Sequence, residues 1–226
     1  MQFLKNIEAP LIGSVNQHSS LESISSILNH VSKNAIANSL WTGFEYQPDC
    51  SFAIAHGNNC IFLKYFIIED DVLLRFTQPN DLVYQDSCVE FFIAFNGEAE
   101  YYNLEFNCIG TCYLGYGTGN KGRETADVEI VKKIKCSPLL YSHEGKIKWE
   151  LTLVIPNEVF FHHNYTSLAS KTGRANFYKC GNNMPVPHYL SWNIIESEKP
   201  NFHLPDFFGS ITFNASVSNQ MVSSSI

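Results

Sequence analysis

Apolar residues recur with two different periods along the chain, and each period predicts a different kind of element. Within residues 20–33 the apolar positions are three or four residues apart, which indicates one amphipathic helix with Ser20 or Ser19 as its N-cap. From residue 51 onward, short apolar runs alternate with turn signals such as HGNN, QPND and FNGEAE. These runs predict strands at residues 51–56, 60–68, 72–77, 88–95, 100–107, 111–116, 127–135, 146–155, 173–179 and 208–213.

Many short strands without an internal repeat are typical of an all-β fold. We therefore predict an antiparallel β-sandwich of immunoglobulin or jelly-roll type with one short N-terminal helix. The expected organisation is a single domain: an N-terminal segment at 1–44 packed on the sandwich, the sandwich at 45–213 and a C-terminal tail at 214–226. Residues 180–207 are rich in Pro and Asn and predict a long ordered loop that is functional or covers the core.

Side chains on a strand alternate between its two faces, which sorts the segment YYNLEFN into a core row and a polar row. The polar row holds Glu105 and Asn107. If residues 88–95 and 100–107 form a hairpin, Glu90 lies on the same side of the sheet as this row. A shift of one residue in the pairing would reverse that prediction.

Glu90 is the only charged residue between Cys88 and Phe95. An ionised carboxylate buried without a partner costs several kcal/mol, roughly, so something must face it. Two alternatives remain open at this point. One is a bound ligand, and the other is a buried ion pair with Arg174, Arg123 or a lysine.

Charge and composition limit the partners. The formal net charge is −7 and no basic cluster is longer than Lys132-Lys133, which argues against nucleic acid and favours a neutral polar or cationic ligand. No apolar run is long enough to span a membrane and no signal peptide is visible, so the chain as written is expected in the cytoplasm, or exported if its N-terminus was processed.

Metal and catalytic motifs are weak. The seven cysteines form no CxxC pair, which indicates free thiols in a reducing compartment. The Cys108-x-x-x-Cys112 spacing and the adjacent His162 and His163 lack further ligands, so we predict no metal there. No nucleophile elbow, phosphate-binding loop or zinc-protease motif is present.

Two carboxylates are what a glycoside hydrolase needs, about 5 to 10 Å apart. Asp86 and Glu90 are separated by about 13 Å if the strand is straight, whereas Glu90 and Glu105 across a hairpin would be closer. Asp86 is better interpreted as a turn carboxylate that accepts backbone N–H groups. A hydrolase using Glu90 with Glu105 or Asp86 is kept as an alternative function.

The aromatic residues differ in their context. Trp149 lies inside an alternating strand and is predicted to be a core residue, whereas Trp192 lies in the Pro- and Asn-rich loop and is a candidate for stacking on a ligand. Tyr84 lies where a loop enters a strand. A protein-interaction β-sandwich with Trp192 as the interface anchor is a further alternative.

Five segments in order, VYQDSCVEFFIAF, YYNLEFNCIG, ANFYKCG, PHYLSW and PNFHLPDFFGSITF, make the chain resemble the carbohydrate-binding module family 9-like proteins over residues 45–213. The resemblance implies a non-catalytic β-sandwich that holds a sugar between two aromatic side chains and hydrogen-bonds it with charged and amide groups. The predicted partner is therefore a mono- or oligosaccharide.

The resemblance also implies the site residues. Tyr84 matches a clamp aromatic six residues before a sugar-contacting glutamate, here Glu90, and Trp192 matches the second clamp residue. Glu105 and Asn107 match polar contacts on the next strand. Tyr84 replaces a tryptophan and Glu105 an arginine, so the family's sugar specificity is not transferred.

The complete set of predicted ligand-binding residues is Tyr84, Glu90, Glu105, Asn107 and Trp192, with Tyr101, Arg123 and His203 as additional candidates. No catalytic residue and no cofactor are predicted. Calcium enters only through the resemblance, because no calcium site is recognisable in the sequence.

Overall fold

The computed structural model describes residues 4–39 and 41–217. Its strands are β1 (Asn6–Leu11), β2 (Asn34–Ala35), β3 (Asp49–His56), β4 (Cys60–Glu69), β5 (Cys88–Phe95), β6 (Tyr101–Asn107), β7 (Cys112–Gly117), β8 (Glu124–Thr125), β9 (Lys135–His143), β10 (Lys146–Pro156), β11 (Thr172–Gly181), β12 (His188–Ser191) and β13 (Gly209–Val217). Its helices are α1 (Leu21–Leu28), α2 (Val128–Val131) and the 3₁₀ turns η1 (Val83–Gln85), η2 (Asn157–Val159) and η3 (Pro205–Phe207). Eight of the predicted strands are present, as β3, β4, β5, β6, β7, β10, β11 and β13.

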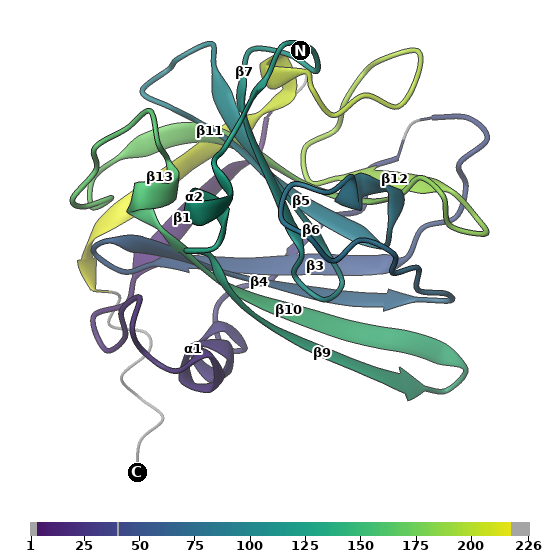
Figure 1. The fold of residues 1–226 in the computed structure, drawn as a ribbon, viewed down its shortest axis with the longest axis horizontal. Helices are drawn as coiled ribbons and strands as arrows, with labels where there is room; N and C mark the ends of the chain where they lie inside the picture. Colours follow the sequence, from purple (N-terminus) through teal and green to yellow (C-terminus); the bar gives the residue numbers. More distant parts are fainter. Residues whose placement is uncertain (1–3, 40, 218–226) are drawn as a thin grey trace.

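The strands form one curled sheet in the order β8-β7-β6-β5-β11-β13-β1-β3-β4-β10-β9. Figure 1 shows β3, β4, β10 and β9 in one layer, with β5, β6 and β11 crossing over them. Phe177 on β11 stacks on Phe52 of β3 with ring centroids 3.7 Å apart, so the two layers pack face to face. The prediction of a β-sandwich is confirmed, and its one departure from antiparallel pairing is β1, which runs parallel to β13 and β3.

Strand β5 has two buried faces, and this explains its unusual sequence. Its inward residues, among them Phe91, belong to the main core between the layers. Its outward residues, among them Cys88 and Phe92, belong to a second apolar cluster beneath the surface loops. Since side chains alternate, Glu90 points outward into this second layer rather than into the main core.

The N-terminal helix is shorter than predicted. Ser20 caps α1 by accepting a hydrogen bond from the Ser23 N–H at 3.2 Å, as the sequence predicted. The helix ends at Leu28, because the next backbone N–H groups form tighter bonds, such as Val31 N–H to Leu28 O. No helix in the described ranges is long and apolar enough to cross a membrane.

The predicted strand at 72–77 is wrong, and the reason is Asp86. One carboxylate oxygen of Asp86, Oδ2, accepts the backbone N–H groups of Arg75 and Phe76 and the side-chain amide of Asn107, each at 3.1 Å. The donors that a strand ladder would use are thus bound to a side chain, and the segment is a loop. The interpretation of Asp86 as a turn carboxylate is confirmed.

The predicted strand at 127–135 is also wrong. Asp127 accepts a hydrogen bond from the Glu129 N–H at 2.7 Å and so caps the short helix α2. An N-capping aspartate followed by a short apolar run marks the start of a helix. Interpreting the alternation of this segment as a strand misses that signal. The strand that follows, β9, was not predicted.

The boundaries of the sandwich are wider than 45–213. Strand β1, from the N-terminal segment, lies between β13 and β3 in the sheet, and β13 continues to Val217. Residues 218–226 of the predicted tail lie outside the described residues. Within 180–207, the predicted loop contains strand β12, which pairs with β11.

A buried ion pair joins the two layers. Lys179 Nζ on β11 lies 2.9 Å from Glu69 Oε2 on β4, and both side chains are fully buried. The Lys179 ammonium directs its hydrogen bonds to Cys180 O and to His188 Nε2. The second Glu69 oxygen accepts the indole N–H of Trp149 at 2.6 Å, and Trp149 is a core residue as predicted.

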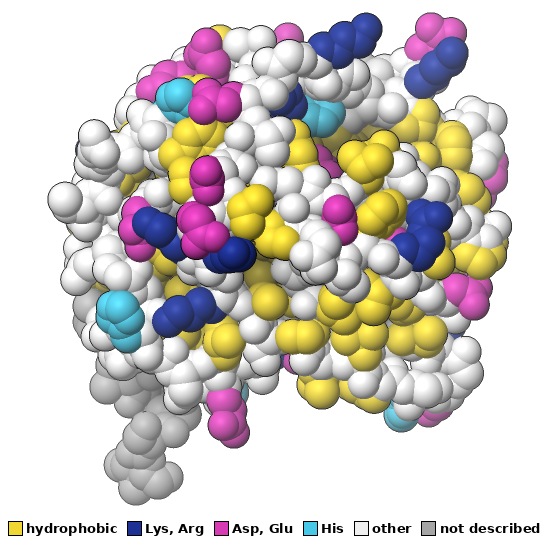
Figure 2. Space-filling view, viewed as in Figure 1, with side chains coloured by type: hydrophobic (Ala, Val, Ile, Leu, Met, Phe, Trp, Pro, Cys, Tyr) yellow, Lys and Arg dark blue, Asp and Glu magenta, His cyan; other side chains and the backbone are white. Residues whose placement is uncertain are grey.

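One hydrophobic region stands out on the face shown in Figure 2. Figure 2 shows hydrophobic side chains gathered over the β9–β10 hairpin, and the exposed ones on β9 are Leu139, Leu140 and Tyr141. Strand β9 is at one end of the strand order, so this region lies along an open edge of the sheet.

Candidate functional site

A cavity of about 460 Å³ lies on the outer face of β5, β6 and β11. This volume falls within the usual range for small-molecule sites, about 300 to 1,000 Å³. The cavity is lined by Asp81, Leu82, Tyr84, Glu90, Asn103, Glu105, Tyr113, Asn120, Arg123, Cys180, Asn182, Tyr189, Pro200, Asn201, Phe202 and His203. Five of the predicted site residues are among them: Tyr84, Glu90, Glu105, Arg123 and His203.

The floor of the cavity is polar and comes from three adjacent strands. Glu90 on β5 stands directly opposite Glu105 on β6, so the predicted hairpin and the shared face are confirmed. The Cys180 thiol on β11 donates to Glu90 Oε1 at 3.1 Å, and the Asn103 amide donates to Glu105 Oε1 at 2.7 Å. Both carboxylates are largely buried, with 4% exposure for Glu90 and 7% for Glu105.

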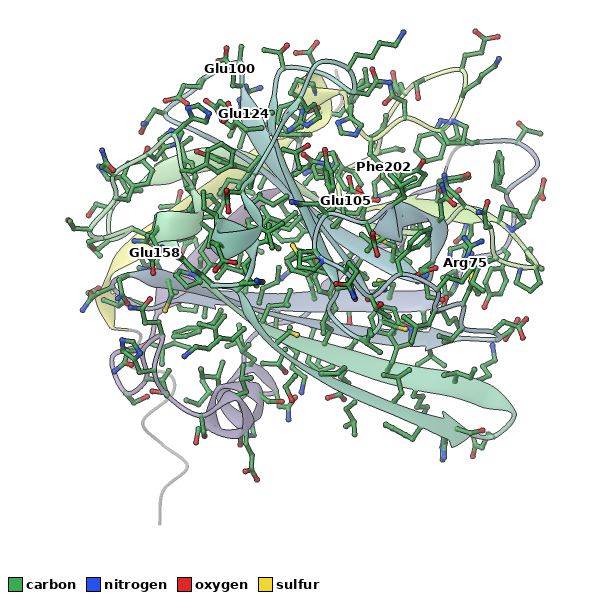
Figure 3. The ribbon with its side chains drawn as sticks, in the orientation of Figure 1. Arg75, Glu100, Glu105, Glu124, Glu158 and Phe202 are labelled. Atoms are coloured by element: carbon green, nitrogen blue, oxygen red, sulfur yellow. The ribbon has the colours of Figure 1, made fainter. Side chains whose placement is uncertain are left out.

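The walls are aromatic. Tyr84 comes from η1, Tyr113 from β7, Tyr189 from β12 and Phe202 from the loop that leads to η3. Figure 3 shows Phe202 beside Glu105, whereas Glu100 and Glu124 lie toward the edge of the molecule. Aromatic walls around a polar floor are suited to a ligand that has apolar faces and polar edges.

Arg123 builds the wall and forms no ion pair with the floor. Its guanidinium donates to Asn103 Oδ1 at 2.8 Å and to the carbonyl oxygens of Tyr101, Gly115, Gly117 and Gly119. Within the described residues, neither Glu90 nor Glu105 belongs to an ion pair. The buried ion pair considered from the sequence is therefore not formed.

Tyr101 is a supporting residue. It is fully buried and does not line the cavity. Its ring lies under the Arg123 guanidinium at 4.4 Å, and its hydroxyl lies 2.8 Å from His203 Nδ1. Burial, followed by the charge of Arg123, lowers the pKa of His203 to about 4, so this imidazole is neutral at physiological pH.

Burial dominates the chemistry of the two carboxyl groups. It raises the pKa of Glu90 well above its usual range, and the neighbouring Cys180 and Glu105 add to that increase. Burial also raises the pKa of Glu105 to about 7, against the opposing effects of the Asn103 hydrogen bond and the Arg123 charge. Both groups therefore retain protons at a pH where an exposed glutamate is ionised.

Replacing Glu105 with glutamine is expected to flatten the pH dependence of stability. Between pH 4.5 and about 7 the folded protein keeps a proton on Glu105 that the unfolded chain releases, so the free energy of unfolding falls as pH rises through this window. Glu105→Gln removes that contribution and keeps the acceptor for Asn103. Urea unfolding across the window measures it, with the exposed Glu100→Gln as control, and an unchanged slope in Glu105→Gln would contradict the assignment.

Asn107 does not reach the cavity, which corrects its predicted role. It is fully buried and its amide donates to Phe76 O at 2.8 Å and to Asp86 Oδ2 at 3.1 Å. It lies two residues beyond Glu105 on β6 and pairs with Cys88 of β5. Asn107 therefore holds the loop before β5 in place, and Asn103, which the prediction did not include, is the amide that lines the cavity.

Trp192 also lies away from the cavity. It follows β12 directly, is 2% exposed, and packs edge-on against Phe52 and Phe177 in the main core. The layer formed by β5 and β11 separates this core from the outer face that carries Tyr84. The predicted clamp of Tyr84 and Trp192 is wrong, and burial excludes Trp192 as an interface anchor as well.

The residues that sequence reasoning missed are Tyr113, Tyr189 and Phe202. Tyr189 and Phe202 lie within the 180–207 segment, which the sequence predicts to be functional or to cover the core. The segment was identified, but its two cavity-lining aromatic residues were not. Alternation along HYLSW supplies the missing signal, because Tyr189 and Trp192 project to opposite sides of the layer. Reading it requires knowing that this short run is a strand.

One group of side chains in the described residues has the arrangement of metal ligands. Donor atoms of Cys88, Glu90 and Cys180 all lie within 4.8 Å of one another. Two sulfur donors and one oxygen suit a zinc-like ion and not calcium, which prefers oxygen ligands alone. All seven cysteines are free thiols, and burial raises the pKa of Cys88 well above its usual range.

The fold is a β-sandwich, and its outer face carries a cavity whose volume and lining suit a small ligand, as in a small-ligand binding module. The model of carbohydrate-binding family 9 matches residues 22–213, and the chain belongs to this family. The family consists of binding modules without catalytic activity, as the resemblance implied. A search among curated proteins gave no match.

Solved structures give the same fold. A crystal structure of a proposed carbohydrate-binding protein from Bacteroides uniformis is 35% identical, with a TM-score of 0.87, and the match covers 94% of this chain and 100% of that one. A family 9 module from Caldicellulosiruptor kristjanssonii in complex with glucose is 14% identical, with a TM-score of 0.58 and coverage of 95% and 98%. A module of the same organism in complex with cellotriose is 13% identical, with a TM-score of 0.57 and coverage of 98% and 100%.

Proposed function

We propose that this protein binds a mono- or oligosaccharide, without catalysis, in the cavity on the outer face of β5, β6 and β11. The observation that carries the proposal is the combination of aromatic walls with a floor of carboxylate and amide groups. Pyranose rings stack their C–H faces on aromatic planes and direct their hydroxyls to such groups. The family supports the proposal, and structures of family 9 modules from Caldicellulosiruptor kristjanssonii were solved in complex with glucose and with cellotriose.

The proposed contacts differ from the clamp implied by the resemblance. Tyr84, Tyr189 and Phe202 pack against the ring, while Glu90, Glu105 and Asn103 take its hydroxyls. Arg123 and His203 complete the wall. No metal or other cofactor is required for this binding, and titrations repeated with a chelator test that part of the proposal.

Titration of the full chain with a panel of neutral sugars is expected to identify a binder, and Tyr84→Ala is expected to weaken it. Removing one stacking ring should reduce affinity at least about tenfold, or about 1.4 kcal/mol. The control is Tyr141→Ala, which removes an exposed tyrosine on β9 and should leave affinity unchanged. Equal affinity for Tyr84→Ala and the unmodified protein would rule out this wall as the binding surface.

A hydrolase using Glu90 and Glu105 is the second candidate, because these carboxyl groups face each other and keep protons to unusually high pH. Glu90 with Asp86 is not a candidate pair, since Asp86 is fully buried and its oxygens hold the 72–77 loop. Turnover of an aryl glycoside that is abolished in Glu90→Gln would favour the hydrolase over the binding module.

A further inference from the structure

The cavity floor carries two glutamates, and in each of them only one of the two side-chain oxygens accepts a hydrogen bond from a described residue. Glu90 and Glu105 each have one oxygen held by a protein donor, the Cys180 thiol and the Asn103 amide respectively. Their second oxygens accept no hydrogen bond from any described residue, although both side chains are more than nine-tenths buried. Each of these glutamates lines the cavity, so the free oxygens are available to whatever occupies it.

The basic residues on the strands and wall around the floor direct their hydrogen bonds to other groups. Arg123 donates to Asn103 and to four carbonyl oxygens in the wall. Arg174 donates to Pro205 O and Glu98 O, and Lys179 points into the opposite layer toward Glu69. Within the described residues, no basic side chain forms an ion pair with either glutamate, although the charge of Arg123 lowers the pKa of Glu105 in opposition to burial.

Two adjacent carboxyl groups that form no ion pair with the protein favour a positively charged guest over a neutral one, because its charge stabilises their ionised forms. A neutral hydroxyl donates one proton to one carboxylate, whereas an ammonium group has three donors and a charge that both carboxylates share. Directly paired residues on antiparallel strands have Cβ atoms about 4.5 to 5.5 Å apart, which lets both side chains reach one small cation.

The walls point to the same chemistry. Tyr84, Tyr113, Tyr189 and Phe202 surround the space above the floor, and aromatic faces attract cations as well as sugar C–H groups. The formal net charge of −7 adds a weak long-range attraction for a cationic ligand. The aromatic wall serves a neutral sugar as well, whereas the net charge would not be needed to hold one.

We propose that the preferred ligand is an amino sugar with a free amine, whose ammonium group lies between Glu90 and Glu105 while its ring packs against the aromatic wall. This inference rests on the proposed function for the location of the site. It goes further by naming the class of sugar, and it makes Glu105 the residue that determines specificity.

The test is calorimetric titration of the full chain with three matched sugars: glucose, glucosamine and N-acetylglucosamine, repeated with the galactose series. The free amine is expected to bind at least about tenfold more tightly than the neutral parent and the acetylated form, which corresponds to about 1.4 kcal/mol. Raising the salt concentration should reduce this preference, because screening weakens a charge interaction.

Glu105→Gln isolates the charge, since glutamine keeps the acceptor for Asn103. The ratio of amine to neutral-sugar affinity should fall to near one in this variant, while the exposed Glu100→Gln leaves the ratio unchanged. Urea unfolding confirms that both variants are folded.

The failures are distinguishable. If neutral sugars bind as tightly as the amines, the inference is overturned and the proposed function stands. If the amine preference survives in Glu105→Gln, the assignment of specificity to the floor is wrong. If no sugar in either series binds, both the inference and the proposed function fail.

Discussion

Replacing Lys179 with methionine is expected to lower the free energy of unfolding by about 3–5 kcal/mol, as is usual when one partner of a buried ion pair is removed. Lys179 and Glu69 are both fully buried between the layers, 2.9 Å apart. Methionine fits the space of the lysine stem but leaves the Glu69 carboxylate without a cation. Urea unfolding at neutral pH measures the loss.

Two controls define this result. The double variant Lys179→Met with Glu69→Gln should recover most of the stability, because glutamine removes the charge and keeps an acceptor for the Trp149 indole. Lys132→Met breaks an exposed pair with Glu129 and should cost less than about 1 kcal/mol. A single Lys179→Met variant as stable as the unmodified protein would show that the pair contributes nothing to the fold.

Trp192→Ala is expected to destabilise the protein by about 3–5 kcal/mol through the cavity it leaves in the core. Its indole packs against Phe52 and Phe177 and lines no part of the ligand cavity. Sugar affinity, measured where the variant is still folded, should therefore stay close to that of the unmodified protein. Chemical unfolding and calorimetric titration on the same preparation give the two numbers.

Tyr84→Ala provides the reciprocal comparison, because it should lose affinity with a much smaller loss of stability. The conservative Trp192→Phe keeps most of the buried area and serves as the check that any effect on binding comes through unfolding. Loss of sugar binding in a fully folded Trp192→Phe protein would return Trp192 to the site and contradict its placement in the core.

Alternation of side chains along strands explains the most successful part of the sequence prediction. Glu90 and Glu105 were placed on one face of one sheet from their positions in two neighbouring runs, and the structure pairs them directly. This succeeds because the segment between the runs is short, and a short connection between two strands fixes the register of a hairpin locally.

The same reasoning failed where long-range contacts decide the outcome. Trp192 and Tyr189 lie three residues apart in a segment that resembles a loop, and nothing local shows that β12 pairs with β11 and turns them to opposite sides. The predicted strand at 72–77 failed similarly, because the Asp86 carboxylate that binds its backbone lies ten or more residues further along the chain.

The sequence by itself determined the all-β class, most of the strands, the cap of the first helix and the outward direction of Glu90, because these depend on periods and caps within a few residues. Five ordered segments of the sequence also indicated the family to which the chain belongs. Only the tertiary structure decided which aromatic side chains surround the cavity, that Arg123 hydrogen-bonds within the cavity wall and that Lys179 forms an ion pair with Glu69. Those choices depend on which distant strands become neighbours, and on which side of a buried layer each side chain then lies.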